Sequence, residues 1–249
     1  VPSKKEEIMK IILDGMGGDN APFSVVEGAV LASRETQHHI CIIGQEELII
    51  PELKKYKYES EKISVINATQ VISNDDAPVR AVRSKKDSSI VKGINMVKNG
   101  EGDIFISAGS TGALLAGGLF ILGRIQGIDR PALASVYPIV GGIPSLLVDA
   151  GANADCKPNN LLEFGIMGNI YMEKVIRRKD PKVGLVNIGA EAAKGSTLTK
   201  AAYDLLEQSH LNFIGNVEAR EVPKGACDVI VTDGFTGNVL LKLTEGLAW

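Results

Sequence analysis

Nine short apolar runs constrain the fold of this chain more than any other feature of its 249 residues. Several are continuous rather than alternating, for example "KIILD" (10–14), "ICIIG" (40–44) and "SLLVDA" (145–150). Continuous apolar strands are buried on both faces, as in a parallel sheet. The other six runs lie at 62–68, 103–108, 133–138, 182–189, 212–216 and 228–234.

Helical patterns separate many of these runs. The patterns lie at 22–34, 88–98, 111–122, 159–177 and 195–208. Strands that alternate with helices are typical of βαβ units. The sequence therefore predicts an α/β fold with three layers, α/β/α, around a mostly parallel sheet.

The length suits one large α/β domain or two small ones. Since no linker or internal repeat is visible, we expect a single α/β catalytic domain over residues 9–249. Residues 1–8 lack the apolar core of a signal peptide and are expected to be an extension or a cloning remnant before Met9. A helical pattern from residue 236 stops at Trp249 too early to cover its sheet, so we expect the chain to be truncated there.

Composition excludes several classes of function. The net charge of −3 argues against a generic nucleic-acid binder. Cys41, Cys156 and Cys227 form no CxxC pair, which fits a reducing cytoplasm better than a disulfide framework or a zinc site. The three histidines form no metal-ligand motif, so we expect no metal and no cofactor. The uncharged runs 104–123 and 131–148 are interrupted by glycines or prolines and are expected to be α/β elements rather than membrane spans.

Five of the predicted strands end in glycine together with Asp, Asn, Ser or Thr. The segments are "DGMGGDNAP" (14–22), "SAGSTGA" (107–113), "DAGANAD" (149–155), "NIGAEAAKGS" (187–196) and "TDGFTGN" (232–238). Ligands of open parallel sheets bind beyond the carboxyl ends of the strands, and helix N-termini there favour anions. We therefore expect these loops to line one cleft that binds phosphate or another oxyanion. None of them matches a Walker loop or GxGxxG.

One of these loops has a second interpretation. "AGSTG" at 108–112 differs from the nucleophile elbow only by Ala108 in the first glycine position, which makes Ser110 a candidate nucleophile. A serine hydrolase also needs a downstream histidine, and only His210 follows, in a segment that reads as an exposed turn. The hydrolase is therefore the weaker alternative.

A basic segment, "PVRAVRSKKDSS" (78–89), is the other feature that stands out on this acidic chain. It concentrates Arg80, Arg83, Lys85 and Lys86, and on a helix Arg80 and Arg83 share one face. The segment is either a solvated helix or a docking surface for an acidic partner.

Taken together, eight motifs resemble the bacterial phosphate acyltransferase (PlsX) family in order from Lys10 to about Lys242. They are "DGMGGDNAP", "DDAPVRAVRSKKDSS", "ISAGSTGALL", "GRIQGIDRPALA", "LLVDAGANADCKP", "VGLVNIGAEAAKG", "NFIGNVEAR" and "DVIVTDGFTGNVLLK". The resemblance implies the fold of isopropylmalate dehydrogenase and phosphotransacetylase. It also implies transfer of an acyl group from acyl carrier protein to inorganic phosphate, the first step toward phosphatidic acid in bacterial phospholipid synthesis.

The resemblance implies partners and a location as well. The family's product is consumed by a membrane glycerol-3-phosphate acyltransferase, and the family enzyme is a cytoplasmic homodimer that associates with the inner face of the membrane. It requires no metal and binds no nucleic acid. The sequence departs from the family at Ser110, where "AGNTGA" commonly has Asn, and Ser retains the ability to donate a hydrogen bond.

Combined with the chemistry of acyl transfer, the resemblance predicts the site residues. The catalytic set is Ser110, Lys194, Asp233 and Asn238. The phosphate- or substrate-binding set is Asp14, Gly17, Gly18, Asn20, Gly109, Thr111, Gly112, Asn153, Thr236 and Gly237. The docking set for the carrier protein is Arg80, Arg83, Lys85 and Lys86. Asp14, Asp149 and Asp233 are expected to orient loops or to accept a proton from phosphate.

Two other functions stay open at this point. One is a nicotinamide-dependent dehydrogenase of the isopropylmalate type, which shares the fold. The other is a non-catalytic module that binds phosphate or acyl groups. The apolar run 112–123 is a candidate lining for an acyl chain, or simply ordinary core.

Overall fold

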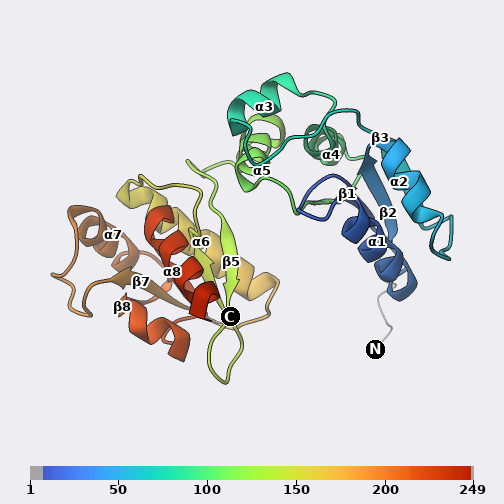
Figure 1. The fold of residues 1–249 in the computed structure, drawn as a ribbon. Helices are drawn as coiled ribbons and strands as arrows, with labels where there is room; N and C mark the ends of the chain where they lie inside the picture. Colours follow the sequence, from blue (N-terminus) through green and yellow to red (C-terminus); the bar gives the residue numbers. More distant parts are fainter. Residues whose placement is uncertain (1–7, 248–249) are drawn as a thin grey trace. The chain divides into compact units, whose positions relative to one another are not determined.

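The computed structural model describes residues 8–247, so all but the last residue of the predicted extension at 1–8 lies outside the described part, as do residues 248 and 249. The chain divides into two compact units, Val1–Arg124 and Ile125–Trp249 (Figure 1). We call them unit 1 and unit 2. That they act as a single catalytic domain, as the sequence suggested, stays a prediction.

Unit 1 is built on a four-stranded sheet. Its strands are β1 (Lys10–Asp14), β2 (His39–Gly44), β3 (Ile63–Asn67) and β4 (Ile104–Ile106). Their order is β3-β2-β1-β4, and every neighbouring pair is parallel. The carboxyl ends of β1 and β4 therefore lie side by side, which brings the loops after these two strands together.

Helices cover both faces of this sheet, and the side chains of its inner strand β2 point alternately into two apolar cores. Ile40 and Ile42 of β2 pack in one core, to which α1 (Phe23–Glu35) and α2 (Glu46–Leu53) contribute. Cys41 and Ile43 pack in the other, together with Met96 of α4 (Ser89–Lys98). Figure 1 shows α1 and α2 beside β2 and β3. The remaining helices of unit 1 are α3 (Pro78–Ser84), α5 (Thr111–Gly117) and the π-helical turn Gly118–Leu122.

Unit 2 contains a five-stranded sheet. Its strands are β5 (Ala134–Tyr137), β6 (Ser145–Val148), β7 (Lys182–Asn187), β8 (Asn212–Glu218) and β9 (Val229–Val231). The order is β5-β6-β9-β7-β8, and of these strands β5 alone runs antiparallel to its neighbour. The carboxyl ends of β6, β9 and β7 thus share one edge of the sheet.

Two layers of helix enclose this second sheet. Val229 and Val231 of β9 pack in the core that includes residues of α6 (Pro158–Lys174) and α7 (Thr197–Glu207). Ile230, which points the other way, packs in a core that includes the 3₁₀ segment Ala219–Lys224 and α8 (Gly234–Leu247). Each unit therefore has three layers and a mostly parallel sheet, which confirms the predicted fold class.

The positions of the strands also agree with the sequence analysis. All nine apolar runs contain a strand, and the uncharged run 104–123 forms β4, a loop, α5 and the π-helical turn. The run 131–148 forms β5 and β6. No helix within residues 8–247 combines the length and apolar character needed to cross a membrane. Helix α2 was not predicted, because Pro51 inside it interrupts the helical pattern.

Candidate active site

A buried carboxylate joins the two neighbouring loops of unit 1. Asp14, the last residue of β1, is only 1% exposed. Its Oδ2 accepts a hydrogen bond from Ser107 Oγ at 2.6 Å, and its Oδ1 accepts one from Met16 N at 3.1 Å. Ser107 Oγ in turn accepts a hydrogen bond from Gly109 N at 3.0 Å. The glycine-rich loop after β1 and the loop after β4 are thereby fixed to each other.

The same two loops approach so closely that a side chain would not fit between them. A Cβ atom on Gly17 would lie 2.7 Å from Gly109 N and 2.7 Å from Asp14 Oδ2. Gly18 has φ +97°, in the region that L side chains rarely adopt. Asn20 is exposed two residues later. Gly17, Gly18 and Gly109, which the sequence predicted as site residues, therefore belong to one cluster, whereas within the described part of the chain no contact of the Asn20 side chain joins it to them.

Ser110 caps the N-terminus of helix α5 beside this cluster. It is the N-cap of α5, and its Oγ accepts a hydrogen bond from Ala113 N at 3.4 Å. Its side chain is buried, whereas Thr111, the first helical residue, is exposed. Gly112 lies against α3, since a Cβ there would be 2.7 Å from Pro78 Cγ. The first turn of a helix leaves backbone N–H groups without partners in the helix, and in α5 this turn begins at Thr111.

Unit 2 has a second buried carboxylate at the end of a strand. Asp149 follows β6 and is 0% exposed. Its Oδ1 accepts hydrogen bonds from the N–H groups of Leu133, Gly151 and Ala152 at 3.1, 3.0 and 2.9 Å. Its Oδ2 accepts from Asn153 N at 2.7 Å and Asn153 Nδ2 at 2.8 Å. Asp149 therefore orders the loop that follows its own strand.

The start of α8 packs against this ordered loop. Asp233 caps the helix, with Oδ1 accepting from Thr236 N at 2.9 Å and Oδ2 accepting from Thr236 Oγ1 at 2.8 Å. A Cβ on Gly237 would lie 1.9 Å from the carbonyl oxygen of Asp149, so only glycine permits the contact. A Cβ built on Gly151 would lie 3.5 Å from Asn238 Oδ1. The predicted residues after β6 and β9 are thus brought together.

The side-chain amide of Asn153, which the sequence predicted to bind substrate, donates its hydrogen bonds within the protein. Asn153 is buried, and its Nδ2 donates to Pro131 O at 2.9 Å as well as to Asp149. Its carbonyl oxygen accepts from Gly234 N at 2.7 Å. Asn153 therefore acts within the fold, tying the loop after β6 to the first residue of α8.

Two asparagines hold the loop that carries Lys194. Asn187 Nδ2 donates to Lys194 O at 3.1 Å and to Asn216 Oδ1 at 3.1 Å. Asn216 Nδ2 donates to Glu191 O at 2.8 Å. Gly195, with φ +97°, fits between Asn187 and Thr199, where a Cβ would collide with both side chains. Lys194 is itself exposed at the end of this anchored loop.

A cleft of about 610 Å³ opens in unit 2 at the carboxyl ends of β7, β8 and β9. Polar side chains from three loops line it, including Asn187, Ser196, Arg220, Asp233 and Thr236. Arg220 supplies a positive charge, and its guanidinium lies 3.1 Å from Glu218 Oε1 and 3.5 Å from Glu221 Oε1. The lining combines hydroxyl and amide groups with one cation, Arg220, and two carboxylates, Glu218 and Asp233, of which Glu218 pairs with Arg220.

Helix α3 covers the first part of the basic segment and carries Arg80 and Arg83, whereas Lys85 and Lys86 follow the end of the helix. The four cations therefore differ in their surroundings. Arg80 and Arg83 are exposed, and the Arg83 guanidinium lies 5.1 Å from the centre of the Phe120 ring. Lys85 Nζ instead contacts Asp76 Oδ2 at 2.6 Å and Val71 O at 2.8 Å, and this hydrogen bond lowers the pKa of Asp76. Lys86 Nζ donates to Val82 O at 3.3 Å. Arg80 and Arg83 are therefore the cations best placed to meet a partner.

The cysteines are poor nucleophiles in this structure. Cys41 is 0% exposed within unit 1. Burial raises the pKa of Cys227 to about 12 and also raises the pKa of Cys156. Since the thiolate is the reactive form, Cys156 and Cys227 lack the activation that covalent catalysis needs. Within residues 8–247 no three His, Cys, Asp or Glu side chains gather as a metal site.

Several residues of these clusters were not predicted from the sequence. Ser107 links Asp14 to the loop after β4, and Asn187 and Asn216 anchor the Lys194 loop. Arg220 lines the cleft of unit 2. The motif "NFIGNVEAR" contains both Asn216 and Arg220 and was the signal that could have found them. Asn187 and Asn216 lie 29 residues apart, so only the pairing of β7 with β8 reveals their contact.

Comparisons with known proteins identify the relatives of this chain. The family described as fatty acid synthesis protein matches residues 9–249. The phosphate acyltransferase of Alkaliphilus oremlandii is 62% identical over 240 residues, which are 96% of this chain and 71% of that protein. The phosphate acyltransferase of Clostridioides difficile is 55% identical over 240 residues, again 96% of this chain and 71% of that protein.

Solved structures share the fold at lower identity. A phosphotransacetylase from Streptococcus pyogenes superposes with a TM-score of 0.71 at 21% identity, covering 98% of this chain and 83% of that one. A 4-hydroxythreonine-4-phosphate dehydrogenase from Burkholderia phymatum has a TM-score of 0.55 at 16% identity, covering 96% of this chain and 84% of that one. The fold is therefore one that acyltransferases and dehydrogenases share, and the close relatives favour the acyltransferase.

Proposed function

This chain belongs to the phosphate acyltransferase (PlsX) family, and from that premise we propose how it forms acyl phosphate. The acyl donor is a thioester of acyl carrier protein, the acceptor is inorganic phosphate, and the products are acyl phosphate and the free thiol of the carrier. The observation that carries this proposal is the 62% identity to a phosphate acyltransferase over 96% of the chain. The reaction supplies the first intermediate toward phosphatidic acid.

The chemistry needs no nucleophile from the protein. Inorganic phosphate has a second pKa of about 7, close to that of phosphoryl groups, so it carries a nucleophilic anionic oxygen at neutral pH. The leaving thiolate has a pKa of about 8.5, which makes a strong general acid unnecessary. The remaining task is to hold two anions together, phosphate and the oxyanion that forms on the thioester carbonyl.

The described contacts support direct transfer between the substrates. Ser110 Oγ is used as a helix cap, and the pKa of two of the cysteines is raised by burial. Positioning both reactants contributes about 7–11 kcal/mol, and each oxyanion donor contributes roughly 2.7–4 kcal/mol. These terms are large enough to account for catalysis without a covalent acyl-enzyme.

We assign the two units different reactants. Backbone N–H groups of residues 109–112 in unit 1 contact the thioester oxyanion, with Ser110 fixing the loop. In unit 2, Lys194 and Arg220 attract phosphate, and residues 236–238, including Asn238, complete the contact. Asp14, Asp149 and Asp233 act by positioning, because their carboxylate oxygens accept hydrogen bonds from the loops around them.

The carrier protein is proposed to dock on α3. Arg80 and Arg83 face solvent on this helix and suit an acidic protein surface, whereas Lys85 is held by Asp76. From the family we also propose a cytoplasmic homodimer at the inner face of the membrane, where a membrane glycerol-3-phosphate acyltransferase consumes the product.

A thiol-release assay tests the proposed function. Palmitoyl-acyl carrier protein is incubated with the enzyme, and free carrier thiol is measured with and without inorganic phosphate. We expect release that depends on phosphate and yields one acyl phosphate per thiol. Release that is independent of phosphate would indicate a hydrolase, and binding without release would indicate a non-catalytic module. Binding of NAD in a thermal-shift experiment would favour the dehydrogenase.

A further inference from the structure

An apolar groove of about 310 Å³ in unit 1 has no assigned role. It lies between α1 and the strands β1 and β4. Its lining carries no Lys, Arg or Glu, and its one carboxylate, Asp14, is tied to Ser107 at the loop end. The apolar lining residues are Ile11, Leu13, Val25, Ala29, Ala32, Ile40, Ile106 and Ala108. A groove of this kind suits an uncharged hydrocarbon ligand.

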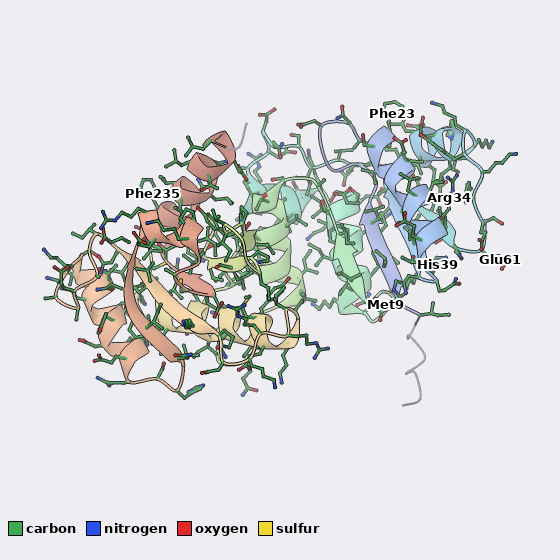
Figure 2. All side chains as sticks on the ribbon, turned by 90° about the horizontal axis from the view of Figure 1, so that it is seen from below. Met9, Phe23, Arg34, His39, Glu61 and Phe235 are labelled. Carbon is green, nitrogen blue, oxygen red and sulfur yellow. The ribbon has the colours of Figure 1, made fainter. Side chains whose placement is uncertain are left out.

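The groove follows the strands away from the candidate active site. Its lining on α1 extends from Ser24 to Ala32, about 12 Å at 1.5 Å per residue. Figure 2 shows Phe23, at the start of α1, at the opposite end of unit 1 from Met9 and His39, which mark the amino ends of β1 and β2. Ser107 and Ala108, in the loop after β4, line the other wall. One end of the groove therefore meets the loops of the proposed oxyanion site, and the other leads toward the amino ends of the strands.

A glycine on α1 keeps part of the groove open. Gly28 lines the groove within the interior of the helix, and a Cβ built on it would meet nothing within 4 Å. Among the residues that occur in helix interiors, glycine is the least favourable after proline. Neither a close contact nor a positive φ requires glycine at this position. We therefore attribute the glycine at position 28 to the open space in the groove that a larger side chain would occupy.

We propose that this groove binds the hydrocarbon tail of the acyl donor and that Gly28 sets the length of tail that it accepts. The inference rests on the proposed function, since it places the thioester at the loop cluster of Asp14, Ser107 and Gly109. The continuity of the groove with that cluster selects the acyl tail over other apolar occupants. The tail then extends between α1 and the β1–β4 pair.

Substitution of Gly28 tests the inference through acyl-chain selectivity. Gly28→Leu fills the open space and improves helix propensity, so the variant should fold. Each methylene excluded from apolar contact weakens binding by about fourfold. We expect kcat/KM for palmitoyl-acyl carrier protein to fall by at least about tenfold, while kcat/KM for the butyryl donor changes by less than about twofold. Gly28→Ala should give a smaller loss.

Gly246→Leu is the matched control, because Gly246 is exposed on α8 and a Cβ there also meets nothing within 4 Å. It should leave the selectivity unchanged. Equal losses with both donors, with or without a lower melting temperature, would overturn the inference and indicate that another segment or a second copy fills the groove. Unchanged palmitoyl kinetics in Gly28→Leu would also overturn it.

A binding measurement separates this inference from the proposed function. The fluorescent fatty acid cis-parinaric acid should bind the wild-type chain and the Gly246→Leu variant, and bind Gly28→Leu at least about tenfold more weakly. This result would stand even if the enzyme released no carrier thiol. Equal binding to all three proteins would contradict the groove assignment while leaving phosphate-dependent acyl transfer intact.

Discussion

The two units fix the loops of their candidate sites around buried carboxylates, but in different ways. Among residues 8–247, Asp149 of unit 2 accepts five hydrogen bonds, whereas Asp14 of unit 1 accepts two. In unit 1 the loops after β1 and β4 are held by these fewer hydrogen bonds and by the close approach of Gly17 to Gly109. Both units also depend on close glycine contacts, at Gly17 in unit 1 and at Gly195 and Gly237 in unit 2, so the difference lies in the number of hydrogen bonds that the buried carboxylate accepts.

This difference matches the reactants that we assign to the two units. Glycine loops leave backbone N–H groups near an apolar groove, as a thioester with a hydrocarbon tail requires. The cleft of unit 2 is polar, with hydroxyl and amide groups, Arg220 and the carboxylates of Glu218 and Asp233 in its wall, and we assign the small reactant, phosphate, to this unit. Variants of both units test this division of the reactants.

Removing the two carboxylates should affect stability unequally. Asp149→Ala leaves the buried N–H group of Asn153 and three partly buried N–H groups without this partner, and each buried group without a partner costs about 1–3 kcal/mol. We expect it to lower the free energy of unfolding by about 4 kcal/mol or more, and Asp14→Ala to lower it by about 2 kcal/mol. Urea unfolding followed by circular dichroism measures both. Equal losses would remove the distinction between the two loop clusters.

Replacing Lys194 should weaken phosphate binding specifically. A hydrogen bond to a charged group contributes about 1.5–3 kcal/mol, so Lys194→Ala should raise KM for phosphate by roughly 10- to 100-fold. KM for the acyl donor should remain within about twofold of the wild-type value. Lys194→Arg, which keeps the charge, is the control and should recover most of the affinity. A larger change in donor KM than in phosphate KM would contradict the assignment of phosphate to unit 2.

Reversing the charge of α3 should affect only the carrier protein. Since exposed ion pairs contribute about 0.2–1 kcal/mol each, Arg80→Glu with Arg83→Glu should raise KM for acyl carrier protein by about five- to tenfold. KM for phosphate should not change. Lys86→Glu is the comparison, because Lys86 donates to Val82 O within its own segment, and it should have a smaller effect. Unaltered kinetics in the double variant would exclude docking on this helix.

The smallest expected effect is a pH dependence in unit 1. The hydrogen bond from Lys85 holds the pKa of Asp76 below its usual value of 3.8. The ion pair therefore contributes stability above that pH, and the contribution is lost as the pH falls through the lowered pKa of the folded state. Asp76→Asn should be slightly less stable than wild type at pH 6, and the difference should shrink below pH 3.8. A constant difference in urea midpoint across this range would show that the Lys85 contact does not act through charge.

Much of the fold could be predicted from the sequence, because buried parallel strands read as continuous apolar runs. All nine strands lie within the apolar runs, although β5 runs antiparallel and β4 is largely exposed, and the exact ends of the strands did not follow from the runs. Helix α2 could not be predicted, since Pro51 breaks its pattern while tertiary packing of Ile49 and Leu53 stabilises it. The division into two units was also hidden, because no change of composition marks residue 124.

The candidate site was less predictable than the fold. Its glycines and carboxylates were visible as strand-end motifs, but their tasks depend on contacts between distant segments. Asn153 appeared to be a substrate ligand, yet its donors bond to Asp149 and Pro131 O. Ser107 was overlooked because only the pairing of β1 with β4 places it on Asp14, 93 residues away.

The central claim is that phosphate attacks the thioester directly, without an acyl group bound to the protein. Intact-protein mass spectrometry of samples quenched during turnover, with phosphate present and withheld, tests it. We predict the mass of the unmodified chain at every time point, while acyl phosphate accumulates only when phosphate is present. An acyl adduct on Ser110 or on any of the three cysteines, formed as fast as turnover and discharged by phosphate, would contradict the account.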